Sequence, residues 1–131
     1  MTELFRDLDG GPLCPNGSVV CIGAFDGLHI GHRALVGHAV ARARTLGVPA
    51  VALSFEPLPR EFFAGGAPPP RLQLPRMKLG ELQALGVDRV GLLHFNAAFA
   101  GLSPEDFVQR LLLARLRARE VWVGPDFRFG R

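Results

Sequence analysis

The sequence predicts an α/β fold with a mostly parallel sheet, because apolar strand-like runs alternate with segments of helical spacing. The runs lie at residues 19–25, 48–55, 87–95 and 120–123. The stretches with motif-like character all follow the ends of such runs. Ligands of parallel sheets bind outside the carboxyl ends of the strands, so the sequence predicts a single cleft at that edge.

The first predicted strand, residues 19–25, is continuously apolar, which is typical of a strand buried on both faces. Leucine and alanine at helical spacing then predict a helix over residues 34–46, with Gly47 placed to end it. The second strand leads into a loop rich in proline and glycine, residues 56–70. Long irregular loops in small domains are usually functional. The sequence does not indicate whether this loop closes as a lid.

A second helix is predicted over residues 75–85, with Gly86 as its stop. Ser103 as N-cap and Pro104 at the first helical position predict a third helix. Residues 1–17 are rich in turn-forming residues, so we expect an N-terminal lead-in followed by one domain at 18–131.

Composition and charge narrow the class of protein. With 48% hydrophobic and 21% charged residues, the chain is expected to be soluble and globular. A net charge of +3 is too mild to predict a nucleic-acid partner. Neither a membrane-spanning run nor a signal peptide is visible, so we expect no membrane partner and a cytoplasmic location. Oligomeric state is not indicated.

Arginines crowd the C-terminal end, and we interpret them mainly as a solvated face with cations near a helix C-terminus. An anion-binding edge is the alternative. These residues are Arg110, Arg115, Arg117, Arg119, Arg128 and Arg131. Cys14 and Cys21 form no C-x-x-C pair, so no disulfide scaffold is expected.

The stretch from Gly23 to His32 is the strongest functional signal. Its glycines allow tight turns and close approach of a ligand, and the helix that follows offers N–H groups to an anion. His29 and His32 are spaced to reach the same polyanion. A zinc site would need a third ligand, for which only His38 and His94 are candidates, so no metal site is predicted.

A nucleoside triphosphate would suit this stretch. Imidazoles and N–H donors stabilise charge on phosphoryl oxygens during in-line displacement. A Walker motif is absent, which argues against a P-loop kinase. The aromatic and proline-rich residues 55–63 predict either a rigid wall for a planar ligand or core packing under a loop, and residues 126–129 share this ambiguity.

Five motifs occur in order along the chain: Gly23-x-Phe25-Asp26-Gly27-x-His29-x-Gly31-His32, Phe55-x-Pro57-x-Pro59, Leu85-Gly86-Val87-Asp88, Ser103-Pro104-Glu105-x-Phe107 and Val123-Gly124-x-Asp126-Phe127-x-Phe129-Gly130. Together they resemble those of bacterial FAD synthetases, specifically the N-terminal FMN adenylyltransferase domain of the bifunctional riboflavin kinase/FAD synthetase. The resemblance covers residues 19–131. It implies a Rossmann-like nucleotidyltransferase fold and the reaction of ATP with FMN to give FAD and pyrophosphate, with Mg²⁺.

The resemblance also implies roles for single residues. His29, His32 and Asp126 are the expected catalytic residues, with both histidines at the ATP phosphates and Asp126 close to where the substrates meet. The expected ATP-binding residues are Gly23, Phe25, Asp26, Gly27, His29, Gly31 and His32. The residues expected near FMN or riboflavin are Pro57, Pro59, Phe63, Phe107 and Phe129.

Three departures lower the activity that the resemblance implies. Ala24 stands where the family usually has Asn, and Leu58 stands where it has His between the prolines. The chain stops at Arg131, before the family's later Ser/Thr-and-Arg motif and its riboflavin kinase domain. We therefore expect a partial domain, incomplete at the C-terminus, with weak or absent adenylyl transfer.

Two alternatives stay open. Ala24 and Leu58 are compatible with a non-catalytic flavin- or nucleotide-binding module. A related nucleotidyltransferase with another phosphate substrate, such as a cytidylyltransferase, is the other, and exclusive use of CTP would support it.

Overall fold

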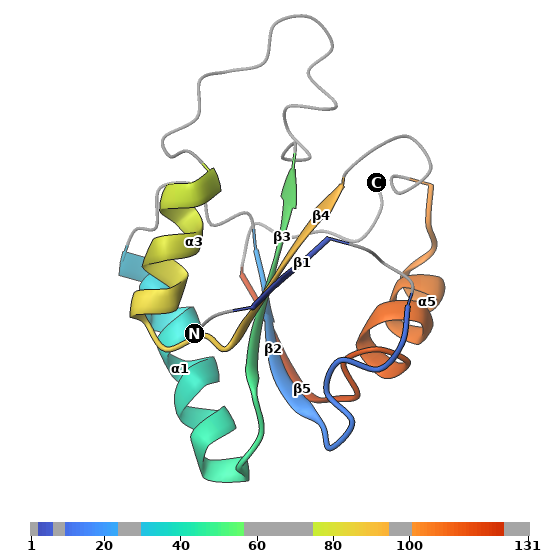
Figure 1. The fold of residues 1–131 in the computed structure, drawn as a ribbon, viewed down its shortest axis with the longest axis horizontal. Helices are drawn as coiled ribbons and strands as arrows, with labels where there is room; N and C mark the ends of the chain where they lie inside the picture. Colours follow the sequence, from blue (N-terminus) through green and yellow to red (C-terminus); the bar gives the residue numbers. More distant parts are fainter. Residues whose placement is uncertain (1–2, 7–9, 24–29, 57–74, 95–100, 125–131) are drawn as a thin grey trace, which may run out of the picture.

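The computed structural model of this chain describes residues 3–6, 10–23, 30–56, 75–94 and 101–124. Its strands and helices alternate along the chain (Figure 1). In order they are β1 (Glu3–Phe5), β2 (Ser18–Ile22), α1 (Ile30–Leu46), β3 (Ala50–Glu56), α3 (Pro75–Ala84), β4 (Arg89–His94), α5 (Pro104–Phe107), η1 (Val108–Leu113) and β5 (Ala118–Val123).

The strands form one five-stranded sheet in the order β1-β4-β3-β2-β5, and each neighbouring pair is parallel. The predicted α/β fold with a parallel sheet is therefore confirmed. Figure 1 shows α1 and α3 on one face of the sheet and α5 on the other. Helices on both faces are what a parallel sheet requires, since neither face can be left to water.

Strand β2 divides the core in two. All five of its residues are buried. Val19 and Cys21 pack in the cluster that α1 and α3 cover, whereas Val20 and Ile22 pack in the cluster under α5 and η1. Alternation of side chains along a strand sends neighbours to opposite faces, so a continuous apolar run fills both clusters.

Local signals fix the ends of several helices. Gly47 and Gly86 follow α1 and α3 with φ angles of +69° and +99°, the left-handed conformation that favours glycine. Ser103 caps α5 as predicted, because its Oγ accepts a hydrogen bond of 3.1 Å from the N–H of Asp106. In contrast, α1 begins at Ile30, upstream of the predicted start at residue 34.

The helix after Ser103 widens where the sequence predicts a regular α-helix. Its hydrogen bonds shift from the fourth to the fifth preceding residue, because the N–H of Ala114 donates to the carbonyl of Gln109 and that of Leu116 to Leu111. A turn of this π type rotates the apolar side chains relative to an α-helix. Leu111, Leu112 and Leu116 remain buried against the sheet.

The lead-in expected at residues 1–17 belongs partly to the sheet. Residues Glu3–Phe5 form the edge strand β1, paired with β4, and Cys14 is 2% exposed in the core under η1. A three-residue strand is too short to carry a periodic signal, which is why the sequence does not reveal it.

Three of the C-terminal arginines bind this lead-in through its main chain, and we call them the arginine clasp: Arg115, Arg117 and Arg119. Their side chains donate to the carbonyl oxygens of Gly11 at 3.1 Å, Pro15 at 3.4 Å and Asn16 at 2.8 Å, respectively. Arg115 is only 8% exposed and lies 5.5 Å from the centre of the Phe5 ring. The interpretation of a solvated face is therefore wrong for Arg115.

Asp88 joins three elements at the amino ends of the strands. Its carboxylate accepts hydrogen bonds of 2.9 Å from the Ala50 N–H and from Nη1 of Arg44, at the end of α1. Burial by itself raises the pKa of Asp88, but the hydrogen bonds from Arg44 and Ala50 outweigh it, so that pKa is lowered. The ionised carboxylate therefore stabilises the fold.

Replacement of Gly91 by alanine should destabilise the sheet. A Cβ at Gly91 would lie 2.6 Å from both Leu53 Cδ2 and Phe5 Cζ, so we expect a loss of about 1–3 kcal/mol in the free energy of unfolding. Chemical denaturation measures it. Gly80→Ala is the matched control, since Gly80 lies in α3 with open space around it, and should gain about 0.5–1 kcal/mol. Equal effects of the two substitutions would contradict this packing.

Replacement of Asp88 by alanine should cost about 1–3 kcal/mol near neutral pH, because the buried Ala50 N–H loses its acceptor. A lowered carboxyl pKa gives stability that is present above the ordinary value of 3.8 and lost as the pH falls below it. The difference in unfolding free energy from the unaltered protein should therefore shrink below about pH 4. A pH-independent difference would show that ionisation of Asp88 is irrelevant.

Candidate functional site

The carboxyl ends of β2 and β5 lie side by side where the direction of strand connection reverses. Strand β2 leads through α1 to β3 on one side, whereas β5 pairs with β2 on the other. The N–H of Gly23 donates to the carbonyl of Leu53 and that of Gly124 to Ile22, both at 3.1 Å. Such a reversal point is where open α/β sheets bind ligands, and the cleft expected at this edge stays a prediction.

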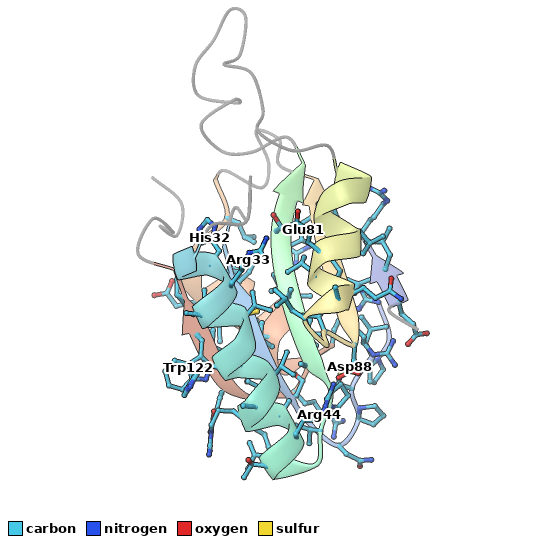
Figure 2. All side chains as sticks on the ribbon, turned by 90° about the vertical axis from the view of Figure 1, so that its left-hand side faces the viewer. His32, Arg33, Arg44, Glu81, Asp88 and Trp122 are labelled. Carbon is cyan, nitrogen blue, oxygen red and sulfur yellow. The ribbon has the colours of Figure 1, made fainter. Side chains whose placement is uncertain are left out.

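The first turn of α1 lies at this same end of the sheet. Because α1 begins at Ile30, Gly31 and His32 belong to that turn. Its backbone N–H groups carry the positive end of the helix dipole, and the turn contains no acidic residue to offset it. His32 is 7% exposed, and Figure 2 shows it at the end of α1. The arrangement is electrostatically suited to an anion.

Three of the expected ATP-binding residues are described, and they are brought together at this edge. Gly23 directly follows β2, while Gly31 and His32 lie in the first turn of α1. Phe25, Asp26, Gly27 and His29 lie outside the described residues, as does Ala24. Asp126, Pro57, Pro59, Phe63 and Phe129 lie outside them too, together with Leu58 and the loop considered as a lid.

Phe107 is the one expected flavin-binding residue within the described ranges. It is 3% exposed and packs in the core cluster that includes Ile22, Leu53, Leu93 and Leu111. The structure therefore gives it a packing role beneath the sheet.

An ion pair that sequence reasoning missed joins the two helices at the carboxyl edge. Nη2 of Arg33 in α1 lies 3.7 Å from Oε2 of Glu81 in α3. Figure 2 shows both residues in the half of the molecule that holds His32, away from Arg44 and Asp88. No local sequence pattern predicts this ion pair, because its two residues are far apart in the sequence. Each of them alone is typical of an exposed position on a helix.

His38 is exposed on α1, as the sequence predicts, and it meets the edge strand β5. Its ring contacts Trp122 edge-on, with 4.3 Å between centroids. The Trp122 indole N–H donates to Glu120, which also pairs with Arg42 of α1. Hydrogen bonds from Arg42 are the main cause that lowers the pKa of Glu120 to about 2. This cluster ties α1 to the outer strand.

No metal centre emerges from the described ranges, where no group of three or more His, Cys, Asp or Glu side chains is placed to hold an ion. Cys14 and Cys21 are both buried free thiols, and burial raises the pKa of Cys21 to about 12. Among the described helices, none is long and apolar enough to cross a membrane.

An open depression of about 440 Å³ lies at the opposite end, near the amino ends of β3 and β4. Its charged lining residues pair with one another, Arg44 with Asp88 and Arg89 with Glu3. It therefore differs from the first turn of α1, where no acidic residue of that turn offsets the helix dipole.

Comparisons with known proteins identify the family of this chain. The family model described as FAD synthetase matches residues 12–131. Proteins named bifunctional riboflavin kinase/FMN adenylyltransferase are 45% identical in Pseudomonas fluorescens and 43% identical in Escherichia coli K12, each over 87% of this chain. The homologue in Haemophilus influenzae is 34% identical over 98% of the chain. This chain spans 36% of the length of the first two and 42% of the third.

A solved structure shares the fold over nearly the whole chain. It is described as a macrolide-efflux protein from Streptococcus pneumoniae, with a TM-score of 0.79 and 28% identity, and the match covers 99% of this chain and 44% of that one. A shared fold does not by itself fix function, so the family rests on the sequence match over residues 12–131. On that match, the chain belongs to the FAD synthetase family.

Proposed function

We propose that the protein transfers the adenylyl group of ATP to FMN, giving FAD and pyrophosphate. The observation that carries this proposal is the FAD synthetase match over residues 12–131, which includes the whole carboxyl edge described above. The matched relatives are named for two activities, and the family model that covers this chain is that of the FAD synthetase. ATP and FMN are then its substrates, and the cytoplasm, where both occur, its proposed location.

In this proposal the ATP phosphates lie at the first turn of α1. The N–H groups of that turn and the side chain of His32 supply donors, and His29 is proposed to join them. Gly23, Phe25, Asp26, Gly27 and Gly31 are proposed to line the nucleotide. The placement of Gly23, Gly31 and His32 at one edge supports this assignment.

The chemistry needs little beyond this arrangement. An oxygen of the FMN phosphate forms a bond to the α-phosphorus of ATP, and the bond from that phosphorus to the bridging oxygen breaks as pyrophosphate leaves. The attacking phosphate is already an anion near neutral pH, so no strong base is required. Donors at α1 stabilise the charge that moves onto the departing pyrophosphate. Asp126 is proposed to lie where the substrates meet.

We propose that Mg²⁺ accompanies ATP. This ion takes oxygen ligands, and nucleotide phosphates supply several of them, with few from protein. That mode suits a chain whose described residues form no three-residue metal cluster. When bound, the ion would neutralise phosphate charge.

The flavin is proposed to lie against residues that follow β3 and β5. Pro57, Pro59, Phe63 and Phe129 would supply rigid apolar contacts to its planar ring. Phe107 is buried in the core cluster under η1, so it would support the flavin-binding residues from below rather than contact the flavin ring with an exposed face.

The test is FAD formation from FMN, ATP and Mg²⁺, with flavins separated by chromatography and pyrophosphate measured in parallel. FAD and pyrophosphate should appear in equal amounts, slowly if Ala24 and Leu58 weaken phosphate binding. Flavin binding that is indifferent to ATP, without pyrophosphate release, would instead identify a binding module. Product formed only with CTP would identify a different nucleotidyltransferase.

Replacement of His32 by asparagine should lower kcat/KM for FAD formation by about 100- to 1,000-fold, because a donor to the phosphates is lost. His38→Asn is the matched control, since it removes an imidazole from the same helix at an exposed position against Trp122. Steady-state kinetics and circular dichroism measure activity and fold together. Equal activity of the His32 variant and the unaltered protein would remove His32 from the mechanism.

Replacement of Gly124 by alanine should separate binding from folding. An added Cβ would meet Leu35 Cδ2 at 3.7 Å and the Ile22 carbonyl at 3.8 Å, which are ordinary contacts, so stability should change by less than about 0.5 kcal/mol. The methyl group would stand at the reversal point between β2 and β5 and should raise a substrate KM about tenfold. Gly37→Ala in α1, where a Cβ meets open space, should leave KM unchanged. An unaltered KM in the Gly124 variant would show that the substrate does not bind at this point.

A further inference from the structure

We propose that Arg33 is a phosphate-binding residue that pairs with Glu81 in the free protein and exchanges this partner for the ATP phosphates. The inference rests on the proposed function, because it assigns a further residue to the same anion site. It assigns opposite effects to the two members of the ion pair: Arg33 strengthens nucleotide binding, and Glu81 competes against it.

Position in the chain places Arg33 beside the site. It directly follows His32 in the first turn of α1, and its side chain reaches across to α3, where Glu81 lies (Figure 2). A cation near a helix N-terminus is electrostatically unfavourable unless a negative charge compensates it. Glu81 provides one negative charge in the free protein, and a bound triphosphate would provide more.

The two members of the pair differ in exposure. The side chain of Arg33 is 57% exposed and that of Glu81 38% exposed, while the Oε2 atom of Glu81 that faces Arg33 is itself buried. The positive end of the pair is therefore turned toward solvent and the negative end inward. A polyanion that approaches this surface meets the guanidinium before the carboxylate.

The pair is also loose by comparison with the one at the far end of the same helix. Arg44 Nη1 lies 2.9 Å from Asp88 Oδ2, and Nη2 donates to the Gly86 carbonyl at 2.7 Å. The 3.7 Å between Arg33 Nη2 and Glu81 Oε2 exceeds hydrogen-bond length. An ion pair with a 57% exposed arginine and an N–O distance beyond hydrogen-bond length contributes little, whereas guanidinium–phosphate bonds are charge-assisted and often bidentate, so the exchange favours phosphate.

The test is calorimetric binding of ATP, and of inorganic tripolyphosphate as a probe without a nucleoside, to single variants. Arg33→Gln should weaken both ligands by about tenfold, since a charge-assisted hydrogen bond is lost. Glu81→Gln should tighten both by about two- to fivefold, because the competitor is removed. In the double variant the affinity should equal that of Arg33→Gln, since Glu81 acts through Arg33.

Controls separate this from a structural role. Arg44→Gln removes the same charge from the other end of α1 and should leave both affinities nearly unchanged. Arg33→Lys keeps the charge without the planar fork and should fall between Arg33→Gln and the unaltered protein, which keeps the test valid if Arg33→Gln folds poorly. Thermal unfolding of each variant reports on folding.

The opposite signs decide the outcome. A pair that only fastens α1 to α3 would shift both affinities in the same direction, or neither, and either result overturns the inference. Failure of the proposed function looks different. The variants would show the predicted changes in ATP affinity, yet the unaltered protein would form no FAD. Normal FAD formation with an ATP affinity unaffected by Arg33→Gln would overturn the inference and leave the proposed function intact.

Discussion

The burial of β2 on both faces is the constraint on which the rest of the structure depends. A strand with all five residues buried needs a helical layer on each side, and the chain supplies α1 and α3 on one side and α5 with η1 on the other. To build both layers the chain must return across β2 before it forms β5. That return creates the reversal point, so the demand for two covered faces also positions the edge at which we propose that ATP binds.

Helix α1 determines the electrostatics at this edge, because its N-terminus lies there. Its far end is fastened by Arg44 to Asp88, and its middle is tied to the outer strand by Arg42 and Glu120. Its first turn carries His32 and no acidic residue to offset the helix dipole, and the Arg33–Glu81 pair there spans 3.7 Å. A helix that is paired at its far end and presents Arg33 and backbone N–H donors at its near end suits the proposed binding of a polyphosphate.

The sequence predicts those features of the fold that depend on interactions between residues close together in the chain. Ser103 acts as a cap and Gly86 as a stop because each acts within a few residues, and apolar runs reveal buried strands whatever surrounds them. The same reasoning predicts that Gly23, Gly31 and His32 lie at one edge of the sheet, and the structure places them there. Sequence reasoning misses β1, the widened turns after Phe107 and the Arg33–Glu81 pair, since these depend on partners that only the folded chain brings together. The family and the flavin substrate were predicted from the resemblance. The residue patterns alone predicted only a turn that binds phosphate.

The arginine clasp has a consequence for how this sequence can diverge. Arg115, Arg117 and Arg119 bind carbonyl oxygens, which every residue possesses, so the side chains at positions 15 and 16 can change without loss of the contact. Gly17 cannot, because its φ is +108° and a Cβ there would lie 2.5 Å from Arg119 Nε. Homologues should therefore vary at positions 15 and 16 yet retain the glycine, because its φ strains any other residue even if the side chain at position 119 changes.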